Sequence, residues 1–275
     1  MKAFLKIEIN RVLRSWGFWI SLLIGLTIAI SQYLMTVIPV IQYMDAYKTA
    51  GLGTIMPHSV FSKWIGGEAV SVQHFLYFMI LPLLCIIPWS LSSFSDRKSG
   101  FIKNLFVRAP KHHYYLPKFI TNFCVGGLLA VIPLILNLLL CSVTLPSLLP
   151  EVSTGTFAIR TTSLWAQLFF SKPYAYIFLY LCVIFVFCGA IALFTSAIGL
   201  ILDNGFSIIL LPFVSHLFLY TIFSSMDMQK FSPFYFLDPF QNAPDISLSI
   251  IVFELIILIT ISVISIVVGA KNECL

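Results

Sequence analysis

Residues 93–118 read SFSDRKSGFIKNLFVRAPKHHYYLPK and separate two long apolar stretches of the chain. The segment carries six of the sixteen Lys and Arg residues. It also keeps four large apolar side chains at helical spacing: Phe101, Ile102, Leu105 and Phe106. This spacing predicts a short amphipathic helix between two hydrophobic spans.

The composition of the whole chain agrees with hydrophobic spans on either side of this segment. The 275 residues are 59% hydrophobic and 10% charged, and the mean hydropathy is +0.99. A soluble domain has about 25% charged residues, and a soluble core of this length could not bury so much apolar surface. We therefore expect a bilayer around much of the chain. We expect no nucleic-acid partner, because the basic residues cluster beside the apolar spans.

Six apolar segments have the roughly 20 residues that a membrane-spanning helix needs. They run from Trp16 to Ile41, His74 to Phe94, Phe119 to Leu145, Tyr174 to Leu200, Phe206 to Phe223 and Leu248 to Ala270. The LDNG turn at 202–205 predicts that the fourth and fifth spans form a helical hairpin. Prolines within the second, third and fifth spans are expected to bend them: Pro82, Pro88, Pro133 and Pro212. The predicted fold is an all-α integral membrane protein with a single domain, residues 1–275.

The basic residues fall mostly on one side of these spans. Eleven of the sixteen precede the first span, lie between the second and third, or follow the sixth. The positive-inside rule makes that side cytoplasmic and places both termini there. Residues 1–15 are expected to form an amphipathic helix in the lipid headgroup layer, with Lys6, Arg11 and Arg14 as its basic residues. The alternative is a simple basic anchor for the first span.

Ionisable residues inside a span are costly and are therefore candidates for a transport pathway. Glu254 lies about two turns from the outer end of the last span, and His216 lies near the middle of the fifth. Either could serve a pathway or only bond two helices together, as could Asn137 in the third span. No metal site is expected, because the chain has no CxxC motif and adjacent histidines on a helix point apart.

Residues 225–246, on the predicted outer side, are rich in aromatic residues and proline. Phe234, Phe236 and Phe240 lie close to Pro233 and Pro239. This composition fits an aromatic belt at the membrane interface. It also fits a re-entrant hairpin that caps a pathway as an outer gate, and the sequence does not choose between the two.

The charged segment, residues 95–109, has three candidate roles. It could lie on the membrane surface, fill a groove in a cytoplasmic partner, or be a solvated basic loop. Asp96 is expected near the start of its helix and Arg108 near the end, where their charges suit the helix dipole. Gly100 is expected at a turn or at a close backbone approach.

The layout and this segment resemble the permease subunit of ABC-2 type ABC exporters. The residues that carry the resemblance are Asp96, Gly100, Leu105, Pro110 and Lys118, together with the stretch FSPFYFLDPF at 231–240. The acid is Asp where the family often has Glu. Phe101 stands where a small residue is usual.

The resemblance implies that the charged segment is a coupling helix, which docks into a separate nucleotide-binding ATPase subunit. Its residues would be Asp96, Gly100, Phe101, Leu105, Phe106 and Arg108. Two permease copies, identical or closely related, would line the pathway in the plasma membrane of a bacterium. The chain has no GxxxxGK[ST] phosphate loop. ATP and Mg²⁺ are therefore expected on the partner, with no cofactor on this chain, which would not itself be an enzyme.

The expected cargo is amphipathic or apolar, because the spans offer aliphatic and aromatic walls with almost no fixed charge. Peptides, toxins, drugs and lipids all meet this description. Two other classes of function stay open. An ion-coupled secondary transporter would be expected to show an internal repeat, and none is visible. A membrane-embedded enzyme would have only His216 and Glu254 as candidate catalytic groups.

Overall fold

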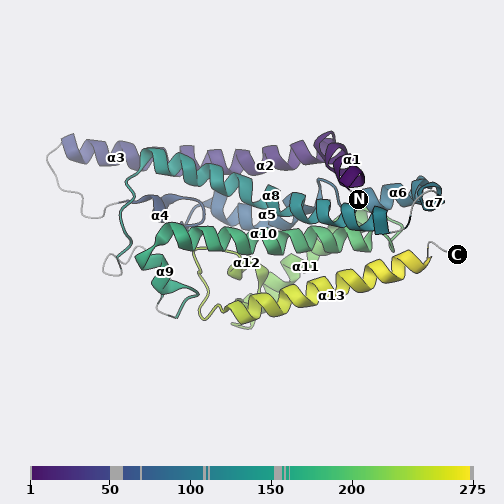
Figure 1. Cartoon of the computed structure of the whole chain (residues 1–275). Coiled ribbons are helices and arrows are strands. Elements are labelled where there is room, and N and C mark those ends of the chain that lie inside the picture. The colour runs from purple at the N-terminus through teal and green to yellow at the C-terminus, as the bar shows by residue number, and fades with distance from the viewer. Residues whose placement is uncertain are drawn as a thin grey trace.

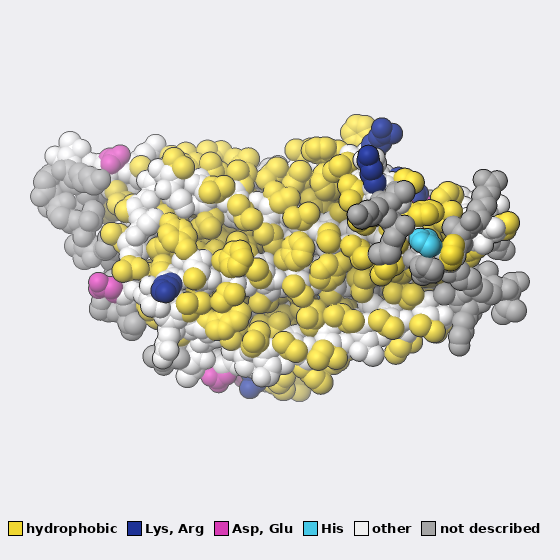
Figure 2. Space-filling view, viewed as in Figure 1, with side chains coloured by type: hydrophobic (Ala, Val, Ile, Leu, Met, Phe, Trp, Pro, Cys, Tyr) yellow, Lys and Arg dark blue, Asp and Glu magenta, His cyan; other side chains and the backbone are white. Residues whose placement is uncertain are grey.

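The computed structural model describes residues 2–49, 58–68, 70–107, 110, 112–151, 157, 159–160 and 162–272. Every regular element within these ranges is a helix. The long helices run side by side in an elongated bundle (Figure 1). On the face shown in Figure 2, hydrophobic side chains cover the middle, and most charged side chains lie toward the two ends, apart from an acidic and a basic one at the lower edge. This distribution is the one that a bilayer requires of a membrane-spanning bundle.

Within the described ranges, five stretches of helix are long and apolar enough to cross a membrane. The first begins with α2 (Trp16–Gln32), passes through the π-helical turn η1 (Tyr33–Val37) and enters α3 (Ile38–Thr49). The other four are α8 (His112–Thr144), α10 (Pro173–Ile198), α11 (Gly205–Ser225) and α13 (Leu248–Asn272). The prediction of an all-helical, multi-pass membrane protein is confirmed at this level.

The predicted second span, His74 to Phe94, is not one helix. α5 (Val72–Ile86) has 15 residues, which is about 22 Å at ~1.5 Å per residue and short of a full crossing. A turn follows at 87–91, and then α6 (Ser92–Lys98) begins. Pro88 explains the break, because proline lacks a backbone donor and its ring clashes with the carbonyl of residue i−4.

α8 begins earlier than the predicted third span. Its first turns contain Tyr114 and Tyr115, which are buried in a small cluster with Ile102 and Leu200. Burial of these aromatic rings compensates for the polar residues around them. The helix therefore begins seven residues before Phe119. The interior of α8 tolerates two prolines.

α10 lies at the centre of the bundle and contacts α5, α8, α9, α11 and α13. Small residues let α8 approach it closely. A Cβ added to Gly126 would lie 2.5 Å from the Cβ of Ala192 and 3.2 Å from the carbonyl oxygen of Cys188. The small residues Cys188 and Ala192 of α10 therefore lie at a helix–helix contact within this chain.

The short elements divide between the two ends of the bundle (Figure 1). The first end, here called the α7 end, holds α1 (Lys2–Leu13), α6, α7 (Phe101–Phe106) and the C-terminal end of α13. The other end, the α9 end, holds α4 (Val60–Lys63) and α9 (Ala166–Ser171). Between α11 and α13 the chain forms the 3-10 turn η3 (Gln229–Phe231) and α12 (Pro233–Phe236).

The predicted helical hairpin at LDNG is present. α10 ends at Ile198, and α11 begins at Gly205. Asn204 caps α11, because its side-chain oxygen accepts a hydrogen bond from the backbone N–H of Phe206 at 3.1 Å. Arg97 of α6 fixes the loop from outside by donating to the carbonyl oxygens of Leu200 and Leu202.

Candidate functional site

Asp96 is the centre of a buried ion cluster at the α7 end. Arg11 Nη2 of α1 donates to its Oδ1 at 2.7 Å. Lys118 Nζ and Tyr114 Oη of α8 both donate to its Oδ2, the hydroxyl at 3.0 Å. Burial alone would raise the pKa of Asp96, but the hydrogen bonds and charges of Arg11 and Lys118 lower it below its ordinary value. The carboxylate is therefore ionised and joins three helices.

Two more residues extend this network toward the N-terminus. Glu8 Oε1 accepts from Arg11 at 2.8 Å, and Glu8 Oε2 accepts from the indole N–H of Trp89 at 3.1 Å. Trp89 lies in the turn between α5 and α6. Glu8, Arg11, Asp96 and Lys118 together carry two negative and two positive charges, and we call these four residues the ion cluster. The cluster ties α1 to the segment that was predicted to couple to a partner.

This arrangement corrects two expectations. Asp96 lies in the last turn of α6, not near a helix start, and only 3% of it is exposed. Its charge therefore serves other helices of the same chain. Lys6 of α1 and Arg14, which follows this helix, are exposed, as an interfacial helix requires, but Arg11 turns inward to Asp96. The predicted Arg108 lies outside the described residues.

The charged segment is two helices, where the sequence favoured one. Gly100 separates α6 from α7 and has a φ of +72°, in the left-handed region. A Cβ built on Gly100 would meet no atom within 4 Å. The glycine therefore serves a turn and not a close approach, because the backbone angle is the constraint that excludes other residues.

α7 presents two apolar sides. Ile102 is 1% exposed and packs on Tyr114, Tyr115 and Phe119, with Leu105 and Phe106 beside it. Phe101 is 45% exposed and Val107 is 87% exposed. A shallow surface hollow lies between them, lined by Phe101, Asn104, Leu105 and Val107. We call these four residues the α7 patch. Only part of the predicted apolar stripe is thus free for a partner.

Residues 225–246, which were predicted to lie on the outer side, pack into the bundle, and we call them the outer segment. Phe234 is 7% exposed and Phe236 is 0% exposed. The ring of Phe236 meets Phe187 of α10 at 5.1 Å, edge to face, and that of Phe234 meets Tyr220 of α11 at 4.8 Å. Both rings are therefore shielded from water by helices of the same chain. Phe240 is half-buried, and the role of all three as an outer gate stays a prediction.

His74 and Asp238 hold this outer segment to α5. His74 Nε2 lies 3.2 Å from Asp238 Oδ2, and both residues are buried. The other ring nitrogen, Nδ1, lies 2.5 Å from the carbonyl oxygen of Ile65. That oxygen can only accept, so Nδ1 carries a proton. Sequence reasoning missed this pair, because 164 residues separate its members.

The His74–Asp238 pair gives a testable prediction about the outer segment. We expect Asp238→Asn to speed hydrogen exchange across residues 229–247 by about tenfold or more, because it weakens a charge-assisted contact between buried groups. Asp245→Asn is the matched control, since Asp245 is an exposed residue of the same segment. Exchange measured by mass spectrometry should change in the first variant only. Equal protection in both variants would mean that the pair does not anchor the segment.

Asn137 is a buried polar link between helices, one of the two roles that the sequence left open for it. Its amide donates to Gln32 Oε1 at 2.7 Å and to the carbonyl of Ala29 at 2.9 Å. Its oxygen accepts from the backbone N–H of Ile65 at 2.8 Å. Gln32 in turn donates to the carbonyl of Lys63. The link joins α8 to α2 and to the loop after α4, which leaves Asn137 no free polar group for a cargo.

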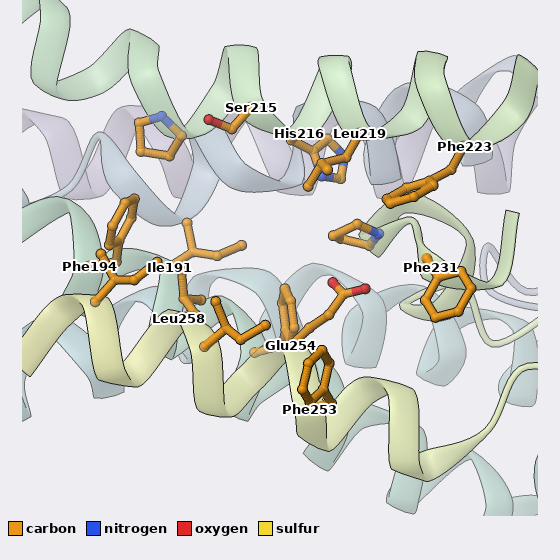
Figure 3. Close-up of a pocket in the computed structure, with 15 residues that line it drawn as sticks. Ile191, Phe194, Ser215, His216, Leu219, Phe223, Phe231, Phe253, Glu254 and Leu258 are labelled. Atoms are coloured by element: carbon orange, nitrogen blue, oxygen red, sulfur yellow. The ribbon is translucent and has the colours of Figure 1, made fainter. Parts of the chain in front are cut away.

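His216 and Glu254 line one apolar cavity of about 380 Å³ between α10, α11 and α13. Figure 3 shows the carboxylate of Glu254 pointing from α13 toward α11, the helix that carries His216. The rest of the wall is almost entirely aliphatic, aromatic or proline. The structure thus brings together the two residues that the sequence marked as pathway candidates. The volume of the cavity and its mostly apolar lining are those of a small-molecule site.

His216 also has a structural role. It makes a hydrogen bond with the backbone of Phe78 in α5. The carbonyl of Phe78 would normally accept from residue 82, and that residue is Pro82, which has no N–H. His216 therefore supplies the donor that the proline removes. Its Nε2 remains buried, with no hydrogen-bond partner among the described residues.

The part of the chain that the structure describes contains no group of three or more His, Cys, Asp and Glu residues suited to a metal ion. The chain matches no model of a protein family, no curated protein and no solved structure. The α7 end and the cavity are the features of the chain that point to a function.

Proposed function

We propose that the chain is the membrane-spanning subunit of an ATP-driven ABC-2 type exporter. The observation that carries this proposal is α7. It is a short helix at one end of the bundle, with an exposed apolar patch, and buried ion pairs hold the adjoining α6 in place. Such a patch suits docking into a groove of a partner protein. The chain itself has no phosphate loop, so a separate subunit would bind ATP and Mg²⁺.

The proposed topology has six passes. α5, the turn at 87–91 and the first residues of α6, as far as Phe94, together would make the second pass, broken at Pro88. The α7 end would face the cytoplasm, because it holds the basic α1, α6 and α7. Both termini would then be cytoplasmic, and α9 and α12 would belong to the outer half. The setting would be the plasma membrane of a bacterium.

The proposed mechanism transmits force from α7 to the helices that line the cavity. Closure of the ATPase subunits would move α7 and, across Gly100, α6. The ion cluster would carry this movement to α1 and α8, while Arg97 would carry it to the loop between α10 and α11. Two permease copies would then open a pathway for an amphipathic or apolar cargo. The outer segment would act as the gate.

Assembly tests the proposal. The full chain, produced with the ATPase encoded beside it, is expected to purify as a complex of two permeases and two ATPases, as measured by native mass spectrometry. Replacing the phosphate-loop lysine of that ATPase should abolish transport in liposomes and leave the complex intact. A monomeric chain that moves cargo without ATP would contradict the proposal.

A further inference from the structure

The cavity between α10, α11 and α13 has few polar groups in its lining. Its fifteen lining residues include only three with polar side chains: Ser215, His216 and Glu254. No Lys or Arg is among them. The remaining wall comes from aliphatic and aromatic side chains of the three helices and from Phe231 and Pro233 of the outer segment. Any occupant must therefore be largely apolar.

The atoms of these polar groups that remain free to form hydrogen bonds are acceptors. Ser215 uses its proton to donate to the carbonyl of Leu211 at 2.7 Å, which leaves its oxygen lone pairs. His216 bonds the carbonyl of Phe78 through one ring nitrogen, so a neutral ring offers its unpartnered Nε2 as an acceptor. Glu254 accepts through its carboxylate and has no hydrogen-bond or ion-pair partner among the described residues. With Glu254 ionised, these groups offer no free donor, and the lining carries no positive charge.

We propose that this cavity binds an apolar molecule that carries a protonated amine. The ammonium group would donate hydrogen bonds to Glu254 and to His216 Nε2, and the apolar body would pack against the aromatic wall. A cavity of about 380 Å³ holds a molecule of small-drug size. An anionic or acceptor-only ligand would leave Glu254 unpaired in an apolar setting, which is costly. The inference names the cargo class of the proposed exporter, but binding itself does not depend on an ATPase.

The experiment uses the full chain, alone, in phosphatidylcholine nanodiscs. The probe is dansylcadaverine, which joins an environment-sensitive apolar ring to a primary amine. Its N-acetyl derivative has the same ring and no positive charge. We expect the amine to bind at least about tenfold more tightly than the acetylated probe, the scale of one charge-assisted hydrogen bond. Both dissociation constants come from the rise in dansyl fluorescence.

Glu254→Gln should remove this preference and leave the affinity for the neutral probe unchanged. Unchanged neutral binding also shows that the variant is folded. Ile257→Trp should weaken both probes, because Ile257 lines the cavity. Val252→Trp is its matched control, since Val252 and Ile257 are both 43% exposed on α13 but Val252 does not line the cavity. Equal affinity for the two probes, or a preference that survives Glu254→Gln, would overturn the proposal.

An ammonium on an apolar body is also the chemistry of an ethanolamine lipid headgroup. Nanodiscs that contain phosphatidylethanolamine distinguish the two sources. Competition with the probe in the wild type, lost in Glu254→Gln, would identify the lipid as the occupant. If phosphatidylethanolamine leaves the affinity for the probe undiminished, the occupant is a free amine and not the lipid. Neither result depends on ATP, so a failure here and a failure of the exporter assembly can be told apart.

Discussion

Replacing Asp96 with alanine is expected to lower the free energy of unfolding by about 3 to 5 kcal/mol. The reason is Lys118, which is 0% exposed and has its ammonium bound to Asp96. Without the carboxylate, a buried positive charge would lose its direct partner. Arg11 would lose its contact as well, but it is partly exposed and can turn to water. Denaturant unfolding in mixed micelles measures the loss.

Asp203 supplies the matched control for this variant. It also pairs with an arginine, Arg97, at 2.9 Å, but its side chain is 95% exposed. Asp203→Ala should therefore cost no more than about 1 kcal/mol. Adding Lys118→Met to Asp96→Ala should recover most of the stability, because it removes the unpaired charge. Equal losses in the two single variants would contradict the assignment of Asp96 as the centre of a buried cluster.

The dependence on pH gives a second readout of the same prediction. The pKa of Asp96 is lower in the folded chain than its ordinary value of about 3.9. A depressed pKa means that the carboxylate stabilises the fold fully above about pH 4 and less as the pH falls below it. The difference between wild type and Asp96→Ala should thus be constant above about pH 4 and shrink in more acidic solution.

The sequence predicted the helical class, the turn at 202–205 and a bend at Pro88, but not that the second span and the charged segment would each divide into two helices. Apolar runs of sufficient length, the Asn204–Gly205 turn and the helix-breaking effect of Pro88 each act through neighbouring residues. Gly100 is similar, since its turn depends on its own backbone freedom. The extent of α8 was not predictable in this way, because its first turns are stabilised by packing against Ile102 of α7 and against Leu200.

The sequence identified several residues of the candidate site, but not the residues that they contact. Asp96 stood out by its place in a charged segment, but its ties to Arg11 and Lys118 span 85 and 22 residues. Periodicity within one helix carries no information about such pairs. His216 and Glu254 stood out as costly residues inside spans. Their meeting in one cavity depends on how α11 and α13 pack against α10, which a single sequence does not specify.

The second large effect is expected from substitutions in the α7 patch. If the ATPase covers this patch, the double variant Phe101→Ala, Val107→Ala should weaken docking by about a hundredfold or more. Fully burying one large apolar side chain contributes roughly 1.5 to 3 kcal/mol, and about 1.4 kcal/mol corresponds to tenfold. Leu105 is left in place because it packs against the cluster around Ile102. Binding of the purified ATPase to the permease in nanodiscs measures the change.

A matched pair of exposed side chains makes the docking test specific to the α7 patch. Leu116 is 45% exposed, like Phe101, and Val143 is 85% exposed, close to Val107. Both lie on α8, outside the α7 patch. Leu116→Ala, Val143→Ala should therefore bind the ATPase as the wild type does. Ile102→Ala should lower stability, because Ile102 is buried within the chain. If the Phe101, Val107 variant inserts, binds and stimulates ATP turnover normally, α7 is not a coupling helix, and its exposed side chains contact lipid or water.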